Sequence, residues 1–165
     1  MRKILVIFIN LMLFCVFFSG CAPKQRGETL NAFVNRMNAA EENYLMTSKG
    51  FIFDETESTL SRFYKFGEKE MLLSFTKNDE NNLKEMNLVF PRELSSEQYS
   101  LDFIRNCIIS FIDDENKCNE LLKEINFEKI INTDFLKTVS AEYDDISIFI
   151  DTTELGTVIT VYKDI

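Results

Sequence analysis

The stretch that decides the fold is STLSRFYKFGEKEMLLSF, residues 58–75. Apolar and polar residues alternate on both sides of its single glycine, as on two half-buried β-strands. Gly67-Glu68-Lys69 lies where the two runs meet, and glycine is favoured in tight turns because it has no Cβ. The stretch therefore predicts a β-hairpin.

Similar runs lie on either side of this hairpin. Phe51 and Phe53 alternate with their neighbours before it, and LKEMNLVF, residues 83–90, follows it after a polar turn. Pro91 is expected to end this last run, because proline cannot donate to a strand ladder. We predict three or four antiparallel strands in a meander over residues 51–90.

A helix is predicted before the meander, from Thr29 to about Ser48. Thr29 can cap its start, and Gly50 stands where a stop signal is expected. The apolar residues of this helix recur at spacings of three and four: Leu30, Phe33, Val34, Met37, Ala40, Tyr44 and Leu45. A stripe this broad would cover a sheet, and a partner-binding helix would show the same pattern.

Two more helices are predicted in the middle of the chain. Ser95 and Gln98 have the spacing of a capping box, which would begin a helix that runs to about Ile112. A second, shorter helix is expected from about Asn116, and residues 127–136 are read as a helical turn.

The end of the chain is strand-like again. Residues 136–143, 146–151 and 157–163 are β-branched and aromatic runs, and Asp144-Asp145 supplies one of the turns between them. The order of helix, strands, helices and strands predicts one α+β domain over residues 29–165. Its antiparallel sheet would have about six or seven strands, with an N-terminal helix and a central helical pair packed on it.

Composition limits the function. The chain has 165 residues, enough for one domain, and 27 acidic against 18 basic residues, a net charge of −9. This charge argues against nucleic acid as a partner, because no basic stripe is available to neutralise phosphates. It is compatible with a basic protein partner or with an ordinary soluble surface. The absence of histidine removes the commonest general base and the usual zinc ligand.

The N-terminus has the pattern of a secretory signal peptide. Met1-Arg2-Lys3 is a short positive region, and Ile4 to Phe18 is apolar except for Asn10. As a helix this run would span about 22 Å, at about 1.5 Å per residue, which is short for a bilayer core that needs about 20 apolar residues. An uncleaved signal anchor and an ordinary signal peptide are the alternatives to the interpretation that follows.

The next residues resemble the lipobox of bacterial lipoproteins. Phe18-Ser19-Gly20-Cys21 matches its usual form, Leu, Ala or Ser, Gly or Ala, Cys, at the last three positions, and Phe18 replaces the usual leucine. The resemblance covers residues 1–21. It implies that the sulfur of Cys21 receives a diacylglycerol and that a lipoprotein signal peptidase cuts between Gly20 and Cys21. Several acyl chains together give the stable anchoring that one chain does not.

The resemblance divides the chain into a cleaved signal peptide (residues 1–20), a lipidated tether (residues 21–28) and the domain. It implies a location on the extracytoplasmic side of the cell membrane, with the outer membrane as a further choice in a two-membrane host. Cleavage removes two of the 18 basic residues and none of the 27 acidic ones, so the net charge falls from −9 to −11. Cys15 is interpreted as a small apolar residue of the signal peptide.

Two cysteines remain, Cys107 and Cys118. An exported domain is in a disulfide-permissive place, and helices that fold back could bring the two together. Both also lie in apolar patterns, so a disulfide and two buried thiols are the alternatives. Neither is predicted to be catalytic, since no histidine can activate it.

The densest acidic stretches are Asp113-Asp114-Glu115 and Asp144-Asp145. Paired carboxylates can hold Ca²⁺ or serve a glycosidase. Neither stretch has the EF-hand pattern, and acidic connecting turns are the simpler interpretation. We therefore predict no catalytic residue, no metal site and no cofactor other than the covalent lipid on Cys21.

The first functional hypothesis is a membrane-anchored, non-enzymatic lipoprotein that binds another protein, an envelope component or a small ligand through a sheet face or edge. The alternative is a lipid-anchored inhibitor or immunity protein against a cationic enzyme or toxin, because opposite charge speeds association. A hydrolase that uses carboxylates is the third hypothesis.

Overall fold

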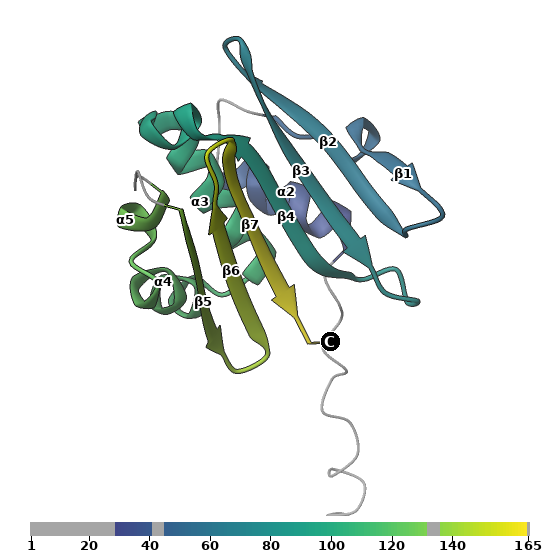
Figure 1. Ribbon diagram of the computed structural model, residues 1–165. Coiled ribbons are helices and arrows are strands. Elements are labelled where there is room, and N and C mark those ends of the chain that lie inside the picture. The colour runs from purple at the N-terminus through teal and green to yellow at the C-terminus, as the bar shows by residue number, and fades with distance from the viewer. Residues whose placement is uncertain (1–28, 41–44, 132–135, 165) are drawn as a thin grey trace, which may run out of the picture.

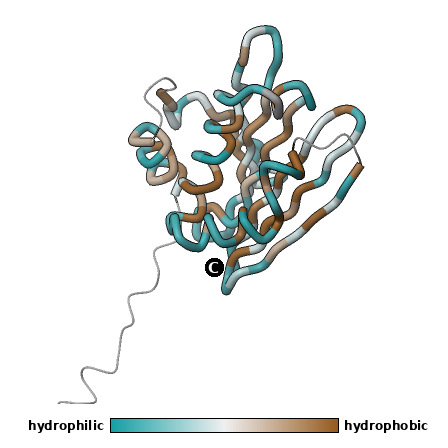
Figure 2. The backbone as a smooth tube through the Cα atoms, turned by 90° about the vertical axis from the view of Figure 1, so that its left-hand side faces the viewer, coloured by the Kyte–Doolittle hydropathy of each residue, from teal (hydrophilic) through white to brown (hydrophobic). Residues whose placement is uncertain are grey.

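A computed structural model describes residues 29–40, 45–131 and 136–164. It confirms the predicted α+β fold, with one seven-stranded antiparallel sheet and the helices packed on one of its faces (Figures 1 and 2). The elements in chain order are α2 (Leu30–Ala40), η1 (Ser48–Gly50), β1 (Ile52–Asp54), β2 (Thr59–Phe66), β3 (Lys69–Lys77), β4 (Leu83–Pro91), η2 (Arg92–Ser96), α3 (Gln98–Ile112), α4 (Glu115–Glu124), α5 (Phe127–Ile131), β5 (Lys137–Tyr143), β6 (Ile146–Thr152) and β7 (Gly156–Lys163).

The predicted hairpin is β2–β3. Phe66 pairs with Lys69, so Gly67 and Glu68 form a two-residue loop. Gly67 has a φ of 63°, a left-handed conformation that costs glycine little because it lacks a Cβ. The turn sets the register of the pair.

The sheet consists of two meanders joined edge to edge, in the order β1-β2-β3-β4-β7-β6-β5. The first meander, β1 to β4, and the second, β5 to β7, are both antiparallel and were both predicted from the sequence. They join where β4 pairs with β7, and this contact places Leu88 beside Ile159 and Met86 beside Val161. All four side chains are fully buried under the helices.

Phenylalanine dominates the core between the helices and the sheet. The rings of Phe33 on α2 and Phe75 on β3 meet edge to face, with centroids 4.7 Å apart, and the ring of Phe111 on α3 stacks against Phe75 at 6.1 Å. Two further rings, Tyr64 and Phe66, pack on Phe103 of α3. These ring contacts hold α2 and α3 against the first meander.

The predicted bounds of the first two helices need correction. The first helix was expected to reach Ser48, but 45–47 have no helical structure and Ser48–Gly50 is a short 3₁₀ turn. Asn38 of α2 explains the change, because its side chain accepts from the amide of Met46 and donates to the carbonyl of Met46, which holds this segment beside the helix.

The capping box at Ser95 is also wrong. Residues 92–96 form the 3₁₀ turn η2, and α3 begins at Gln98 with Glu97 as its N-cap. The side chain of Gln98 bonds forward to Asp102 instead, with Nε2 2.9 Å from Oδ1.

Candidate functional site

The face of the sheet away from the helices is the most distinctive surface of the domain. The alternation of buried and exposed residues along the strands places Phe63, Leu72, Val89 and Val158 on this face. They are direct cross-strand partners on four adjacent strands, so they form one continuous row across β2, β3, β4 and β7. We call this set the apolar row, and the uncovered side of the sheet the open face.

Two members of the apolar row are well exposed. Phe63 is 61% exposed and Val89 39%, while Leu72 and Val158 are half-buried by their neighbours. Single exposed apolar residues are common on any protein, but contiguous ones more often mark a surface that another molecule covers.

A chain of hydrogen bonds runs beside the apolar row. Thr160 on β7 donates through Oγ1 to Oδ1 of Asn87 on β4, at 2.7 Å, and Nδ2 of Asn87 donates to Oε1 of Glu85, at 2.6 Å. Phe149 lies opposite Thr160, and Tyr162 lies opposite Glu85. The open face therefore presents ordered polar groups between exposed aromatic side chains, a composition enriched in protein interfaces.

The open face is also acidic. The cross-strand partners assigned to it by register include one lysine, Lys65, which lies 3.5 Å from Glu70. Carboxylates outnumber this lysine on the open face: Asp54, Glu70, Glu85, Glu142 and Asp151. The sequence shows the total charge but not this distribution, which follows from the register.

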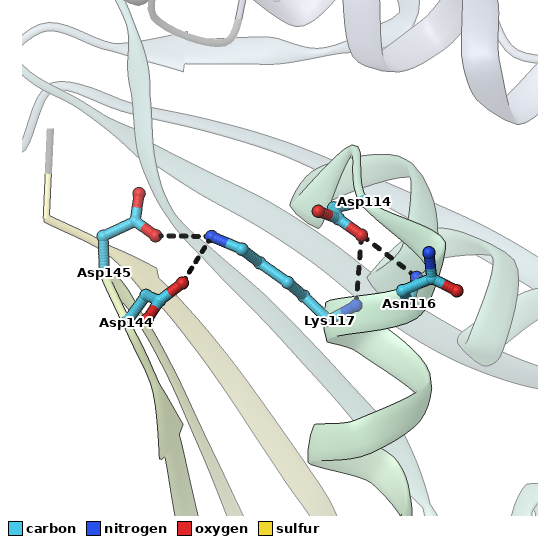
Figure 3. A network of polar contacts seen from close by, with 5 residues as sticks. All are labelled: Asp114, Asn116, Lys117, Asp144 and Asp145. Carbon is cyan, nitrogen blue, oxygen red and sulfur yellow. Dashed lines mark hydrogen bonds and ion pairs between the residues drawn. The ribbon is translucent and has the colours of Figure 1, made fainter.

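The predicted acidic clusters have structural partners. Asp113 lies 3.2 Å from Nη1 of Arg36, which ties the end of α3 to α2. Asp114 is the N-cap of α4, because its Oδ1 accepts from the amides of Asn116 at 3.0 Å and Lys117 at 3.1 Å (Figure 3).

Lys117 pairs with both carboxylates of the second acidic cluster. Its Nζ lies 3.1 Å from Asp144 and 3.3 Å from Asp145, which clamps α4 onto the β5–β6 turn (Figure 3). Hydrogen bonds to Asp144 and then to Asp145 raise the pKa of Lys117. The simpler interpretation of both acidic stretches, as connecting turns, agrees with these contacts. Within the described ranges, no group of three or more histidine, cysteine or carboxylate residues is placed to hold a metal.

The cap of α4 gives a direct test of this arrangement. Asp114→Ala removes both bonds to the helix amides and is expected to lower the free energy of unfolding by about 1 kcal/mol. Asp114→Asn is the matched control, because asparagine caps about as well, so its urea midpoint should stay near that of the parent protein. Equal losses in both variants would mean that the charge of Asp114, not its cap, is what stabilises α4.

Cys107 and Cys118 are both buried free thiols in this structure. Of the two alternatives left by the sequence, a disulfide and buried thiols, the structure has the second. Burial raises the pKa of Cys107 far above its ordinary value and that of Cys118 to about 12. Both thiols are therefore protonated and poorly nucleophilic near neutral pH.

The predicted lipidation and cleavage positions, Gly20 and Cys21, lie outside the described residues, as do Cys15 and the tether over 22–28. In the part of the chain that the structure does describe, no helix is long and apolar enough to cross a membrane.

Comparison of the chain with protein-family models, with curated proteins and with solved structures finds no match in any of the three.

Proposed function

We propose that this protein is a bacterial lipoprotein with a non-enzymatic binding role in the cell envelope. Its domain would be tethered by lipid on Cys21 to the extracytoplasmic side of the membrane and would bind its partner through the open face. The observation that carries the binding role is the apolar row, which crosses four strands on a sheet face that no helix of the described chain covers. The lipobox-like residues support the anchor.

The open face suits a protein partner better than a small ligand. The row extends across four strands at about 4.8 Å per strand, so it is a broad surface rather than an enclosed pocket. Exposed aromatic residues at its side, Phe149 and Tyr162, supply contact area at little cost in conformational entropy.

Replacement of Cys21 tests the anchor. Cys21→Ser removes the sulfur to which the lipid would attach, so the unprocessed precursor should accumulate and metabolic labelling with a radioactive fatty acid should be lost. Cys15→Ser is the matched control, and it should be lipidated and processed normally. If Cys21→Ser is processed and labelled like the parent chain, the lipoprotein assignment is wrong.

Site-specific photo-crosslinking tests the binding face. A photoreactive phenylalanine analogue in place of Phe63 is expected to give a discrete adduct in intact cells. The same analogue in place of Tyr99, an exposed aromatic residue of α3 on the helical side, should give none. Adducts of equal yield at both positions, or none at Phe63, would contradict binding through the open face.

The acidity of the open face favours a second candidate function, an anchored inhibitor or immunity protein against a cationic enzyme or toxin. Opposite charges raise the association rate, and salt weakens this effect. The adduct yield at position 63 should then fall with rising salt, and Glu85→Gln with Asp151→Asn should lower it more than Glu120→Gln with Glu124→Gln, two exposed residues of α4 in the helical layer. A yield independent of salt would exclude electrostatic capture and leave the general binding role intact.

A further inference from the structure

A groove lies on the helical layer, between α3, α4 and α5. One hollow of about 500 Å³ is lined by residues from all three helices, and a second, of about 180 Å³, adjoins it through Arg105, Phe127 and Glu128. The larger hollow falls within the range of about 300–1,000 Å³ typical of small-molecule sites. We call the two hollows together the helical groove.

The lining of the larger hollow has a net positive charge, although the chain as a whole is acidic. Three cations line it, each from a different helix, namely Arg105, Lys123 and Lys129, against one carboxylate, Glu128. In the described ranges of the chain, no carboxylate lies within ion-pair distance of Lys123 or Lys129. Three positive side chains therefore lie together at one hollow in a chain whose net charge is −9.

One of these cations is held in place. Nη2 of Arg105 donates to Oδ1 of Asn119 on α4, at 2.9 Å, which fixes the guanidinium across the α3–α4 contact. A guanidinium carries five N–H donors, so others remain for an anion, and its planar fork matches phosphate and carboxylate oxygens. The amides of Asn119 and Asn126 add neutral polar groups to the same lining.

Apolar side chains line part of the helical groove. Leu122 and Phe127 line the larger hollow and are buried, and Leu101 and Ile131 continue the apolar lining in the smaller hollow. The smaller hollow also has Asp102 in its lining, so the groove as a whole has three cations and two carboxylates, and the excess of positive charge lies at the larger hollow. Positive charge beside apolar side chains matches a ligand that has both a negative group and a hydrocarbon part.

We propose that the helical groove binds the phosphate group of an amphiphilic anion, with Arg105, Lys123 and Lys129 around the phosphate and Phe127 against the hydrocarbon. This chemistry has two sources, a free alkyl phosphate ester and the headgroup region of an anionic phospholipid. The site is distinct from the open face and does not depend on the function proposed for it.

Calorimetric titration of the full chain in phosphatidylcholine nanodiscs tests the proposal, with hexyl phosphate and inorganic phosphate as probes. Hexyl phosphate is expected to bind saturably and more tightly than inorganic phosphate. Lys123→Ala with Lys129→Ala should weaken it at least about ten-fold, because each charge-assisted bond is worth about that much. Lys49→Ala with Lys84→Ala, which removes two lysines away from the groove, should leave the affinity unchanged.

The same titration in nanodiscs that contain phosphatidylglycerol distinguishes the sources. Loss of hexyl phosphate binding there means that the phospholipid headgroup occupies the groove, and unchanged binding identifies a free ester as the ligand. The proposal is overturned if hexyl phosphate shows no saturable binding at millimolar concentration. It is equally overturned if the two double variants bind hexyl phosphate alike.

Discussion

Replacement of Phe75 with alanine is expected to lower the free energy of unfolding by about 3–5 kcal/mol, a large part of the stability of a single domain. Phe75 is fully buried on β3, and its ring contacts three others, those of Phe33, Phe51 and Phe111, at centroid distances of 4.7, 5.7 and 6.1 Å. Its loss would leave a cavity between α2, α3 and the sheet, and these elements cannot all close over the space.

Phe63 is the matched control for this prediction. It is the same residue type on the neighbouring strand, but it lies on the open face and is 61% exposed. Phe63→Ala should change the free energy of unfolding by no more than about 0.5 kcal/mol, as is usual for exposed positions. Urea denaturation followed by circular dichroism measures both variants, and similar losses would contradict the assignment of Phe63 to an uncovered face.

The contrast between these two phenylalanines has a functional consequence. A side chain that contributes little to stability yet exposes much of its ring to water is costly to keep on a soluble surface, because it promotes unspecific association. Phe63→Ala should therefore separate the two roles, with loss of partner capture and an unchanged fold. This separation makes the open face testable without a variant that unfolds.

Local sequence patterns predict the strands and their turns well. Each hairpin has its own signal, such as Gly67 between β2 and β3 or Asp144-Asp145 between β5 and β6, and Asp144 adopts a φ of 52° at its turn. The alternation of residues along each strand also predicts which side chains are buried. Strands and turns depend on residues that are adjacent in the chain, so they can be predicted from one sequence.

The contact between the two meanders could not be predicted in this way. β4 and β7 pair although more than sixty residues separate them in the sequence, and no local pattern in either strand identifies the other as its partner. The open face depends on that pairing, because Val89 and Val158 become neighbours only when the meanders join. One sign of the open face is present in the sequence. Aromatic residues occupy strand positions whose alternation points them to the polar side, namely Phe63, Phe149 and Tyr162.

Runs of acidic residues show a different limit of sequence patterns. A run of carboxylates has the same sequence whether it holds a cation, caps a helix or pairs with a lysine. Asp114 and Asp144 take the last two roles, through partners that are close in space and, for Asp144, far in sequence. The three cations of the helical groove have the same limit, since each lies on its own helix and only the fold brings them together.

The second prediction with a large effect is a loss of stability at alkaline pH. Cys107 and Cys118 are buried and protonated in the folded state, where burial raises the pKa of Cys118 from 9.0 to about 12 and that of Cys107 well above 9.0. Above pH 9 the unfolded chain loses these protons and the folded chain keeps them. The free energy of unfolding should therefore fall as pH rises, by about 1.4 kcal/mol per pH unit for each thiol.

Two other groups act in the same direction at higher pH. Burial raises the pKa of Tyr64 above its ordinary value of 10.0, and the two aspartates raise that of Lys117 above 10.5, so the folded state retains both protons longer than the unfolded chain does. The range between about pH 9 and pH 10 is therefore where the thiols can be measured apart from these groups.

Urea denaturation at steps of pH from about 8 to 10, with a reductant present, measures the loss in a chain that carries Cys15→Ser and Cys21→Ser. Cys107→Ala with Cys118→Ala supplies the control. These changes lower the stability at every pH because they leave cavities, but the slope between pH 9 and 10 should flatten, since no thiol remains to titrate. The same measurement without reductant tests the two free thiols of the structure against a disulfide. A disulfide binds no proton in either state and would give a flat profile, whereas two buried thiols give a steep one whether or not reductant is present.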